Sequence, residues 1–241
     1  MTVVPYKDNS ASKKEQVSTM FDNISGKYDL LNRLLSGGID IYWRKRAIAL
    51  LKPEKPQLIL DIATGTGDLA VEAHRQLKPK KIIGVDISEG MLAQGREKMK
   101  KLGLEEQIEL QMGDSEKLLF DDNTFDAVIV SFGVRNFENL LKGLTDMFRV
   151  TKPGGTCVIV EFSKPSSFPM KQLYAFYSNT VLPAIGRLIS KDQSAYSYLP
   201  ESVQAFPDGK DFLTIFEQAG FQQTQCKKLT FGICSIYTGK K

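Results

Sequence analysis

Short apolar runs alternate with amphipathic helical patterns along most of this chain. Helical patterns lie at about 68–77, 91–103, 140–150 and 211–221, and strand-like runs lie at 58–63, 81–87, 108–114, 125–131, 156–163, about 222–228 and about 231–237. Parallel strands need a crossover connection, and a helix is its usual form. The alternation therefore predicts an α/β fold with a seven-stranded, mostly parallel sheet covered on both faces, whose last two strands form an antiparallel hairpin.

Two further segments flank this core. Residues 15–51 show a helical pattern broken twice, with Gly37 and Gly38 closing the second helix and Pro53 stopping the third. The stretch 164–210, between the fifth strand and the last helix, is rich in aromatic residues and too long for a plain connection. We expect 15–51 to form an N-terminal helical lid and 164–210 an inserted helical cap, within one domain spanning 1–241. Residues 1–14 are polar and are expected to be mobile.

Composition excludes several classes of protein. The 32 basic and 28 acidic side chains give a net charge of +4, too small to indicate nucleic-acid binding. No apolar stretch reaches the roughly 18 residues that span a bilayer, and no signal peptide is recognisable. The three cysteines lack C-x-x-C spacing, so neither a disulfide framework nor a metal site is expected. These features predict a cytoplasmic protein that is at most peripheral to the inner membrane.

A glycine-rich turn follows the first strand in LDIATGTGDLA. Gly65 and Gly67 allow a tight turn and a close approach of the backbone to a ligand. The flanking carboxylates, Asp61 and Asp68, would repel a pyrophosphate but suit a cationic ligand. The turn therefore favours a charged nucleoside over a dinucleotide.

Acidic residues also end the next two strands. Asp86, in GVDIS, is placed to take both hydroxyls of a ribose, and Asp114 with Ser115, in GDSEKL, is placed to meet an adenine edge. Each motif alone has a plain structural explanation, as a tight turn or a helix cap. Together with the P-G-G turn before the fifth strand, their order and spacing indicate the class I methyltransferase fold, a Rossmann-like sheet that binds S-adenosylmethionine.

The chain resembles the menaquinone/ubiquinone biosynthesis C-methyltransferases over nearly its whole length. The resemblance is carried by VSTMFDNISGKYDLLNRLLSGGIDIYWRKRA, LDIATGTGDLA, GVDISEGML, GDSEKLLFDDNTFDAVIVSFGVRNFEN, RVTKPGG, VIVEFSKP, YSYLPESVQAFPDG and FGICSIYTGKK. It implies S-adenosylmethionine-dependent methylation of a ring carbon in a polyprenylated quinol, with S-adenosylhomocysteine as the second product. Demethylmenaquinol is the favoured acceptor, although enzymes of the ubiquinone pathway share these motifs. By position, the resemblance implies cofactor contacts at Thr66, Asp86, Asp114, Ser115 and Ser131.

Carbon methylation of a quinol requires help in removing a phenolic proton, whose pKa is about 10. The only histidine, His74, is expected on a solvated helix face, so it is not a good candidate base. Arg135 and Asn136 follow the fourth strand in SFGVRN, where Arg135 could stabilise a developing phenolate and Asn136 could hold the quinol hydroxyl or a water. Tyr28 is a third candidate for the pocket.

Each of these candidates also has a structural interpretation. Arg135 could pair with Asp40 or Glu161, Asn136 could cap the following helix, and Tyr28 could be a packing residue. The aromatic cap could hold the ring and prenyl tail or form a homodimer interface. The cap or the basic cluster at 44–46 could touch a membrane transiently, or the cluster could simply be solvated.

Other functions remain open at this level. They are methylation of another small aromatic or a lipid, and a non-catalytic cofactor-binding module. An NAD-dependent oxidoreductase is disfavoured by Asp61 and Asp68.

Overall fold

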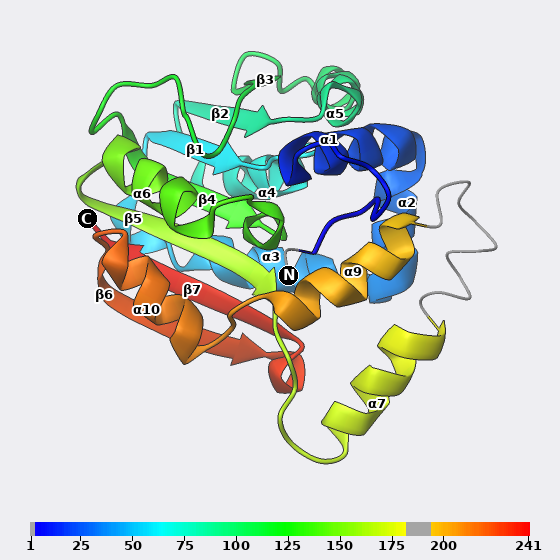
Figure 1. Ribbon diagram of the computed structural model, residues 1–241. Coiled ribbons are helices and arrows are strands. Elements are labelled where there is room, and N and C mark those ends of the chain that lie inside the picture. The colour runs from blue at the N-terminus through cyan, green and yellow to red at the C-terminus, as the bar shows by residue number, and fades with distance from the viewer. Residues whose placement is uncertain (1–2, 182–193) are drawn as a thin grey trace.

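A computed structural model describes residues 3–181 and 194–241 and shows a single twisted sheet in their midst (Figure 1). Its strands run in the order β3-β2-β1-β4-β5-β7-β6. Strands β1 to β5 are mutually parallel, and β7 runs antiparallel to both β5 and β6. The strand bounds are Leu58–Ile62 (β1), Lys81–Asp86 (β2), Ile108–Met112 (β3), Phe125–Ser131 (β4), Thr151–Phe162 (β5), Gln222–Leu229 (β6) and Cys234–Lys240 (β7). The predicted sheet and its closing hairpin are confirmed.

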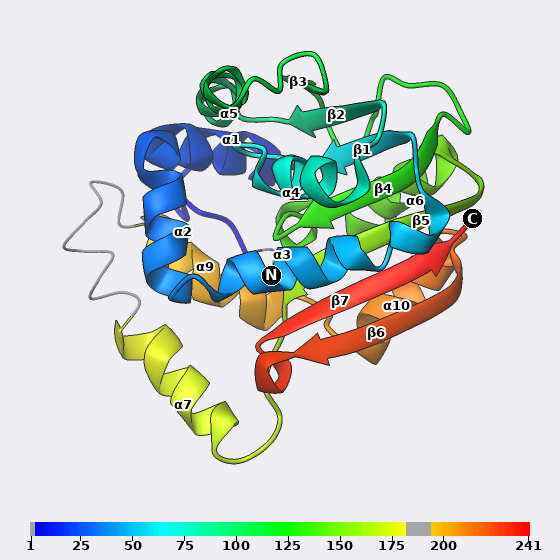
Figure 2. The same cartoon turned by 180° about the vertical axis from the view of Figure 1, so that it is seen from behind.

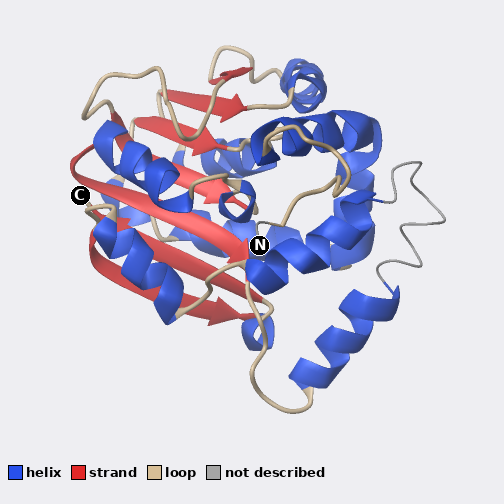
Figure 3. Ribbon diagram, viewed as in Figure 1, coloured by secondary structure: helices blue, strands red, loops and turns tan. Residues whose placement is uncertain are grey.

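Helices cover both faces of the sheet, as Figures 2 and 3 show from opposite sides. Because successive strand residues point to opposite faces, Ile59 belongs to one apolar core and Leu60 to the other. The first core is closed by α3 (Ile39–Ala49), α4 (Asp68–Leu77) and α5 (Glu89–Leu102), and the second by α6 (Leu140–Val150) and α10 (Lys210–Gln218). Strands buried on both faces explain why β1 and β4 read as continuous apolar runs.

The fifth strand begins earlier than predicted. It starts at Thr151, not at 156, so the P-G-G turn lies inside it. Phe125 pairs with Thr151 and Ala127 pairs with Thr156, so the residues between them bulge out of the ladder. A Cβ on Gly155 would lie 2.8 Å from the Asp126 carbonyl oxygen, which explains the glycine at the end of this bulge.

The N-terminal helices are α1 (Lys13–Ile24) and α2 (Tyr28–Ser36), joined by a 3₁₀ turn at Ser25–Lys27. Gly37 and Gly38 have φ of +59° and +78° and separate α2 from α3, as predicted. The expectation of a mobile segment up to residue 14 is wrong at its end. Ser12 and Glu15 form a capping box that starts α1 at Lys13.

The described part of the inserted segment contains three helical stretches. It contains α7 (Met170–Phe176), a π-helical turn at Tyr177–Val181 and α9 (Ser194–Ala205), whereas residues 182–193 of the expected cap lie outside the described residues. Helix α9 crosses the carboxyl edge of the sheet and packs against α1, where Val17, Met20 and Tyr198 form a third apolar core (Figure 1). Within the described ranges, no helix has the length and apolar character needed to cross a bilayer.

Candidate active site

A narrow pocket lies at the carboxyl ends of β1, β2 and β4, where the strand order reverses direction. It brings together five of the residues predicted to contact the cofactor: Gly65, Asp86, Asp114, Ser115 and Ser131. Helix α1 closes the pocket from above with Val17 and Phe21. Strand ends and the N-terminal helices therefore line one pocket.

Asp86 is held rigidly in this pocket. Its Oδ2 accepts the Gly65 N–H at 2.8 Å and its Oδ1 accepts the Ser88 N–H at 2.9 Å. The side chain is buried, and this burial raises its pKa to about 6. Both oxygens keep further lone pairs, so Asp86 can still accept hydrogen bonds from a diol.

Other predicted cofactor residues lie behind the glycine turn and do not line the pocket. Thr66 donates to Asp29 Oδ1 at 2.6 Å and accepts from Lys98 Nζ at 2.9 Å. A Cβ on Gly67 would meet Met99 at 3.0 Å, so this glycine serves helix packing. Cofactor contacts at Thr66 and Gly67 stay predictions.

Asp61 also lies behind the turn. It accepts the Thr64 hydroxyl at 2.6 Å. Burial raises the pKa of Asp61 to about 7. Its role as a cofactor contact stays a prediction. In this structure the carboxyl is buried and hydrogen-bonded to Thr64 of the same turn.

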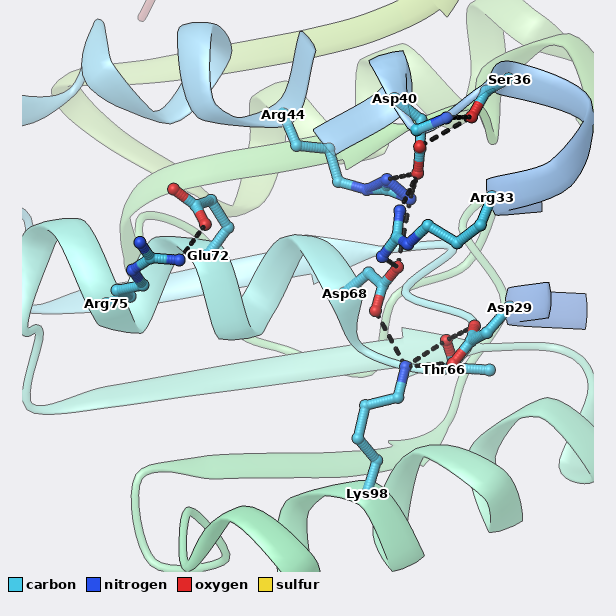
Figure 4. A network of polar contacts seen from close by, with 11 residues as sticks. Asp29, Arg33, Ser36, Asp40, Arg44, Thr66, Asp68, Glu72, Arg75 and Lys98 are labelled. Atoms are coloured by element: carbon cyan, nitrogen blue, oxygen red, sulfur yellow. Dashed lines mark hydrogen bonds and ion pairs between the residues drawn. The ribbon is translucent and has the colours of Figure 1, made fainter. Parts of the chain in front are cut away.

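Asp68 faces cationic side chains of the protein (Figure 4) and does not line the pocket. It pairs with Arg33 at 2.8 Å, Arg44 at 3.2 Å and Lys98 at 2.8 Å. Burial alone would raise the pKa of Asp68, but Lys98, Arg44 and Arg33 lower it overall. These pairs join α2 and α3 to the start of α4 and to α5.

Arg44 is not part of an exposed basic cluster. It is 5% exposed and pairs with Asp40 at 2.6 Å. Asp40 also pairs with Arg33. The idea that Arg44 itself meets solvent or a membrane is therefore wrong, because the buried carboxylate of Asp40 and the half-buried carboxylate of Asp68 hold it inward.

Two lysines that sequence reasoning missed reach the site from the start of α1. Lys14 pairs with Asp114 at 2.6 Å. Lys13 Nζ donates to the carbonyl oxygens of Arg135 at 3.1 Å and Phe137 at 2.8 Å, and burial lowers its pKa to about 8. The capping box S-K-K-E could have located the helix start, but nothing local indicates partners about a hundred residues away.

A second, larger cavity of about 450 Å³ adjoins the first pocket. Its wall is mostly aromatic and aliphatic and comes from α1 to α3, from the end of β4, and from α7 and α9 of the inserted segment. The two cavities share Phe21, Tyr28, Phe132 and Asn136. These four side chains mark the place where the two cavities meet. A molecule in the larger cavity can therefore bring an atom close to a molecule in the smaller one there.

Phe132 sits at this junction in a strained conformation. Its φ is +59°, a left-handed value that non-glycine residues adopt rarely, at a cost of about 1–3 kcal/mol. Gly133 follows, and a Cβ there would come within 2.5 Å of the Ala63 Cβ. The glycine of SFGVRN thus leaves room for the turn after β1, and it also lines the smaller pocket.

Arg135 lines the larger cavity from the 3₁₀ turn Val134–Asn136. Its Nη1 contacts Glu161 Oε1 at 2.7 Å and also donates to the Phe132 carbonyl, while Asp40 is not a partner. Glu161 is fully buried. The predicted pairing with Glu161 is confirmed, but the Arg135 Nε is buried without a hydrogen-bond partner among the described residues.

Asn136 does not cap the next helix, because Asn139 does so by accepting the Lys142 N–H at 3.0 Å. Instead Asn136 Oδ1 accepts the Tyr198 hydroxyl at 3.1 Å. Tyr28, also at the junction, packs edge-to-face on Phe21 with ring centroids 5.9 Å apart, and burial raises its pKa. His74 is half-buried on α4 and lines neither cavity.

Residues 9–241 match the model of the ubiE/COQ5 methyltransferase family. The chain belongs to this family. It is 53% identical over 239 residues to a demethylmenaquinone methyltransferase of Bacteroides fragilis, covering 99% of this chain and 97% of that protein. It is 45% identical to a Geobacter sulfurreducens protein named ubiquinone/menaquinone biosynthesis C-methyltransferase UbiE, covering 95% and 90%. The protein is therefore a methyltransferase.

Solved structures support the fold. A SAM-dependent methyltransferase from Thermotoga maritima superposes with a TM-score of 0.65 at 18% identity, covering 93% of this chain and 99% of that one. A Haemonchus contortus phosphoethanolamine N-methyltransferase crystallised with S-adenosylhomocysteine gives 0.60 at 17% identity, covering 81% and 52%. At these identities the likeness establishes the class I methyltransferase fold alone.

Proposed function

We propose that this enzyme transfers a methyl group from S-adenosylmethionine to a ring carbon of a polyprenylated quinol, with demethylmenaquinol as the acceptor. The observation that carries the proposal is the large aromatic cavity that shares a wall with the cofactor pocket. Its volume of about 450 Å³ is in the range of small-molecule sites. Relatives named demethylmenaquinone methyltransferase, at 53% and 42% identity over nearly the full chain, support the choice of acceptor.

The smaller pocket fits S-adenosylmethionine in the types of side chain that it offers. Asp86 would accept the ribose hydroxyls, and Asp114 with Ser115 would meet the adenine. Gly65, with φ of +56°, lets the backbone pass close to the ligand. When bound, the cofactor supplies an electrophilic methyl on a sulfonium, and Ser131, Tyr28 and Asn136 lie where this group would meet the acceptor.

Charge control at the acceptor would come from Arg135. Removal of the phenolic proton becomes easier when a cation stabilises the phenolate. Arg135 lines the cavity and pairs with Glu161 at 2.7 Å, and its buried Nε has no hydrogen-bond partner among the described residues. No histidine lines the cavity in the described part of the chain, and the carboxylate that does, Asp40, is held by Arg33 and Arg44. We therefore assign the proton to a water molecule and the stabilisation of the phenolate to Arg135.

The prenyl tail would leave between the lid and the cap. Leu30 and Leu34 of α2 and Leu173 and Phe176 of α7 are all more than half exposed, and their helices also contribute side chains to the cavity. An apolar rim of this kind suits a brief contact with the membrane that holds a long-tailed quinol. A homodimer through the cap stays an unsupported alternative for the same surface.

The direct test is to delete the gene in its host and extract the quinones. We expect demethylmenaquinone to accumulate and menaquinone to be restored by the wild-type gene. Accumulation of a demethylated benzoquinone would instead assign the ubiquinone pathway. An unchanged quinone profile would contradict both. Calorimetry with S-adenosylhomocysteine and with NAD checks the cofactor separately, and binding of NAD alone would overturn the proposal.

A further inference from the structure

One hydrogen bond links the inserted segment to the junction of the two cavities. Tyr198, on α9, is 3% exposed, and its hydroxyl lies 3.1 Å from Asn136 Oδ1, 62 residues away in sequence. Its ring is fixed against Val17 and Met20 of α1. The hydroxyl therefore reaches Asn136 from a packed and oriented ring.

The direction of this bond follows from the chemistry of both groups. Burial raises the pKa of Tyr198 to about 12, so its hydroxyl keeps its proton at neutral pH and can donate it. Asn136 Nδ2 lies 3.5 Å from the Phe132 carbonyl oxygen. Rotating the amide by half a turn would bring Oδ1 to that carbonyl, and two acceptors would face each other. The amide oxygen therefore faces Tyr198, and the NH₂ group is directed toward the Phe132 carbonyl.

This orientation determines what Asn136 can offer to an acceptor. Its Oδ1 is engaged by Tyr198, and only one hydrogen of Nδ2 points toward Phe132, at a long distance. The other hydrogen has no acceptor among the described residues. Asn136 lines both cavities, so it presents a donor at the point where they meet.

We propose that Tyr198 is a positioning residue, which fixes the Asn136 amide so that its N–H donates to the oxygen of the bound acceptor. This inference rests on the proposed function, since the acceptor is taken to be a phenol. A donor aimed at that oxygen stabilises the phenolate more than the phenol and lowers the pKa of the bound acceptor. Asn136 thus assists deprotonation as a donor and does not itself receive the proton. The inserted segment must be docked for this donor to be in place.

Other charged and titratable groups also face the junction. Tyr28 from α2 lies at the junction itself, and the larger cavity is lined by Arg135 and by Tyr174 from α7. Behind them, Glu161 pairs with Arg135, and Lys13 binds the carbonyl of Arg135. Arg135 favours the phenolate whether or not the Tyr198 hydroxyl is present. Its effect is therefore the same in the parent enzyme and in a variant that lacks this hydroxyl. The contribution of Tyr198 is the part that disappears when its hydroxyl is removed.

The test compares Tyr198→Phe with Tyr177→Phe. Both tyrosines come from the inserted segment and line the same cavity, but the Tyr177 hydroxyl donates to the Leu35 carbonyl at 2.6 Å and not to Asn136. Single-turnover methylation of demethylmenaquinol is measured as a function of pH with saturating cofactor. For Tyr198→Phe we expect a rate about tenfold lower near neutral pH and a midpoint about one unit higher, because the bound acceptor ionises less readily. For Tyr177→Phe we expect an altered KM with the midpoint of the parent enzyme.

A double-mutant cycle separates positioning from packing. If Tyr198 acts through Asn136, the shift caused by Tyr198→Phe vanishes in an Asn136→Ala background. Equal pH midpoints for Tyr198→Phe, Tyr177→Phe and the parent, or a shift that persists without Asn136, would overturn the inference. An inactive parent enzyme would instead refute the proposed function. If both tyrosine variants have the melting temperature of the parent enzyme, their folds are intact.

Discussion

At the scale of single residues, Arg135 combines two properties that rarely occur together. Its guanidinium is anchored by the buried carboxylate of Glu161 and by the Phe132 carbonyl, so its position is fixed. Its Nε is buried without a hydrogen-bond partner among the described residues. An unsatisfied buried donor costs about 1–3 kcal/mol. The structure thus holds this guanidinium fixed at the wall of the larger cavity.

Arg135→Lys tests this role. Lysine keeps the charge but cannot reproduce the planar fork that holds Glu161 and the cavity at once. We expect the single-turnover methylation rate to fall by about 10²-fold or more, in the range for removal of an oxyanion-stabilising donor. Calorimetry with S-adenosylhomocysteine is the control and should show near-parental affinity. A rate within a few-fold of the parent would show that Arg135 is structural only.

At the scale of elements, we expect the N-terminal helices to control access to the cofactor pocket. The pocket between α1 and the sheet holds about 60 Å³, far less than the roughly 300 Å³ of even small ligand sites. We therefore expect the helices to shift when a cofactor enters or leaves. Lys98 of α5 links α2 to the glycine turn and to α4, since it bonds Asp29 of α2 as well as Thr66 and Asp68 (Figure 4).

Lys98→Met should loosen this closure. The substitution removes the cation that Asp29 and Asp68 share, and we expect S-adenosylhomocysteine to dissociate about threefold to tenfold faster, since pairs that are partly exposed contribute modestly. Stopped-flow displacement measures the rate. Lys101→Met is the matched control, because Lys101 is exposed near the end of the same helix, outside this network. Equal dissociation rates for the two variants would mean that the network does not limit opening.

An element could be predicted from the sequence when it depends on neighbouring residues of the chain. It was missed when it depends on contacts between residues far apart in sequence. The strands β1 and β4, the glycine turn and the Gly37-Gly38 break were predictable because periodicity and φ preferences are local. The bulge at the start of β5 was missed because it depends on contacts with the neighbouring strand. The pairs Lys14–Asp114 and Tyr198–Asn136 were also missed, since only the folded chain brings them together.

At the scale of the whole molecule, buried carboxyls make the stability of the fold depend on pH. Burial holds the pKa of Asp61 at about 7 and that of Asp86 at about 6, against about 4 for an aspartate in an unfolded chain. Between these values the folded state binds more protons than the unfolded state, so the free energy of unfolding falls as pH rises. Lys13, with a pKa of about 8, acts in the opposite direction only above that pH.

Asp61→Asn isolates the largest of these contributions. Asparagine keeps an oxygen for the Thr64 hydroxyl, which Asp61 now accepts at 2.6 Å, but it cannot ionise. Because the parent loses the contribution of neutral Asp61 as pH rises from 5 to 8, its free energy of unfolding should fall by about 2–3 kcal/mol over that interval from this group. Urea denaturation at pH 5 and pH 8 measures the drop, which should be smaller by about that amount in Asp61→Asn. Asp121→Asn, at an exposed loop position, should leave the drop as it is in the parent. If Asp61→Asn and Asp121→Asn show the same pH dependence, Asp61 is already ionised at neutral pH inside the fold, and its burial must be compensated by the polar groups around the glycine turn.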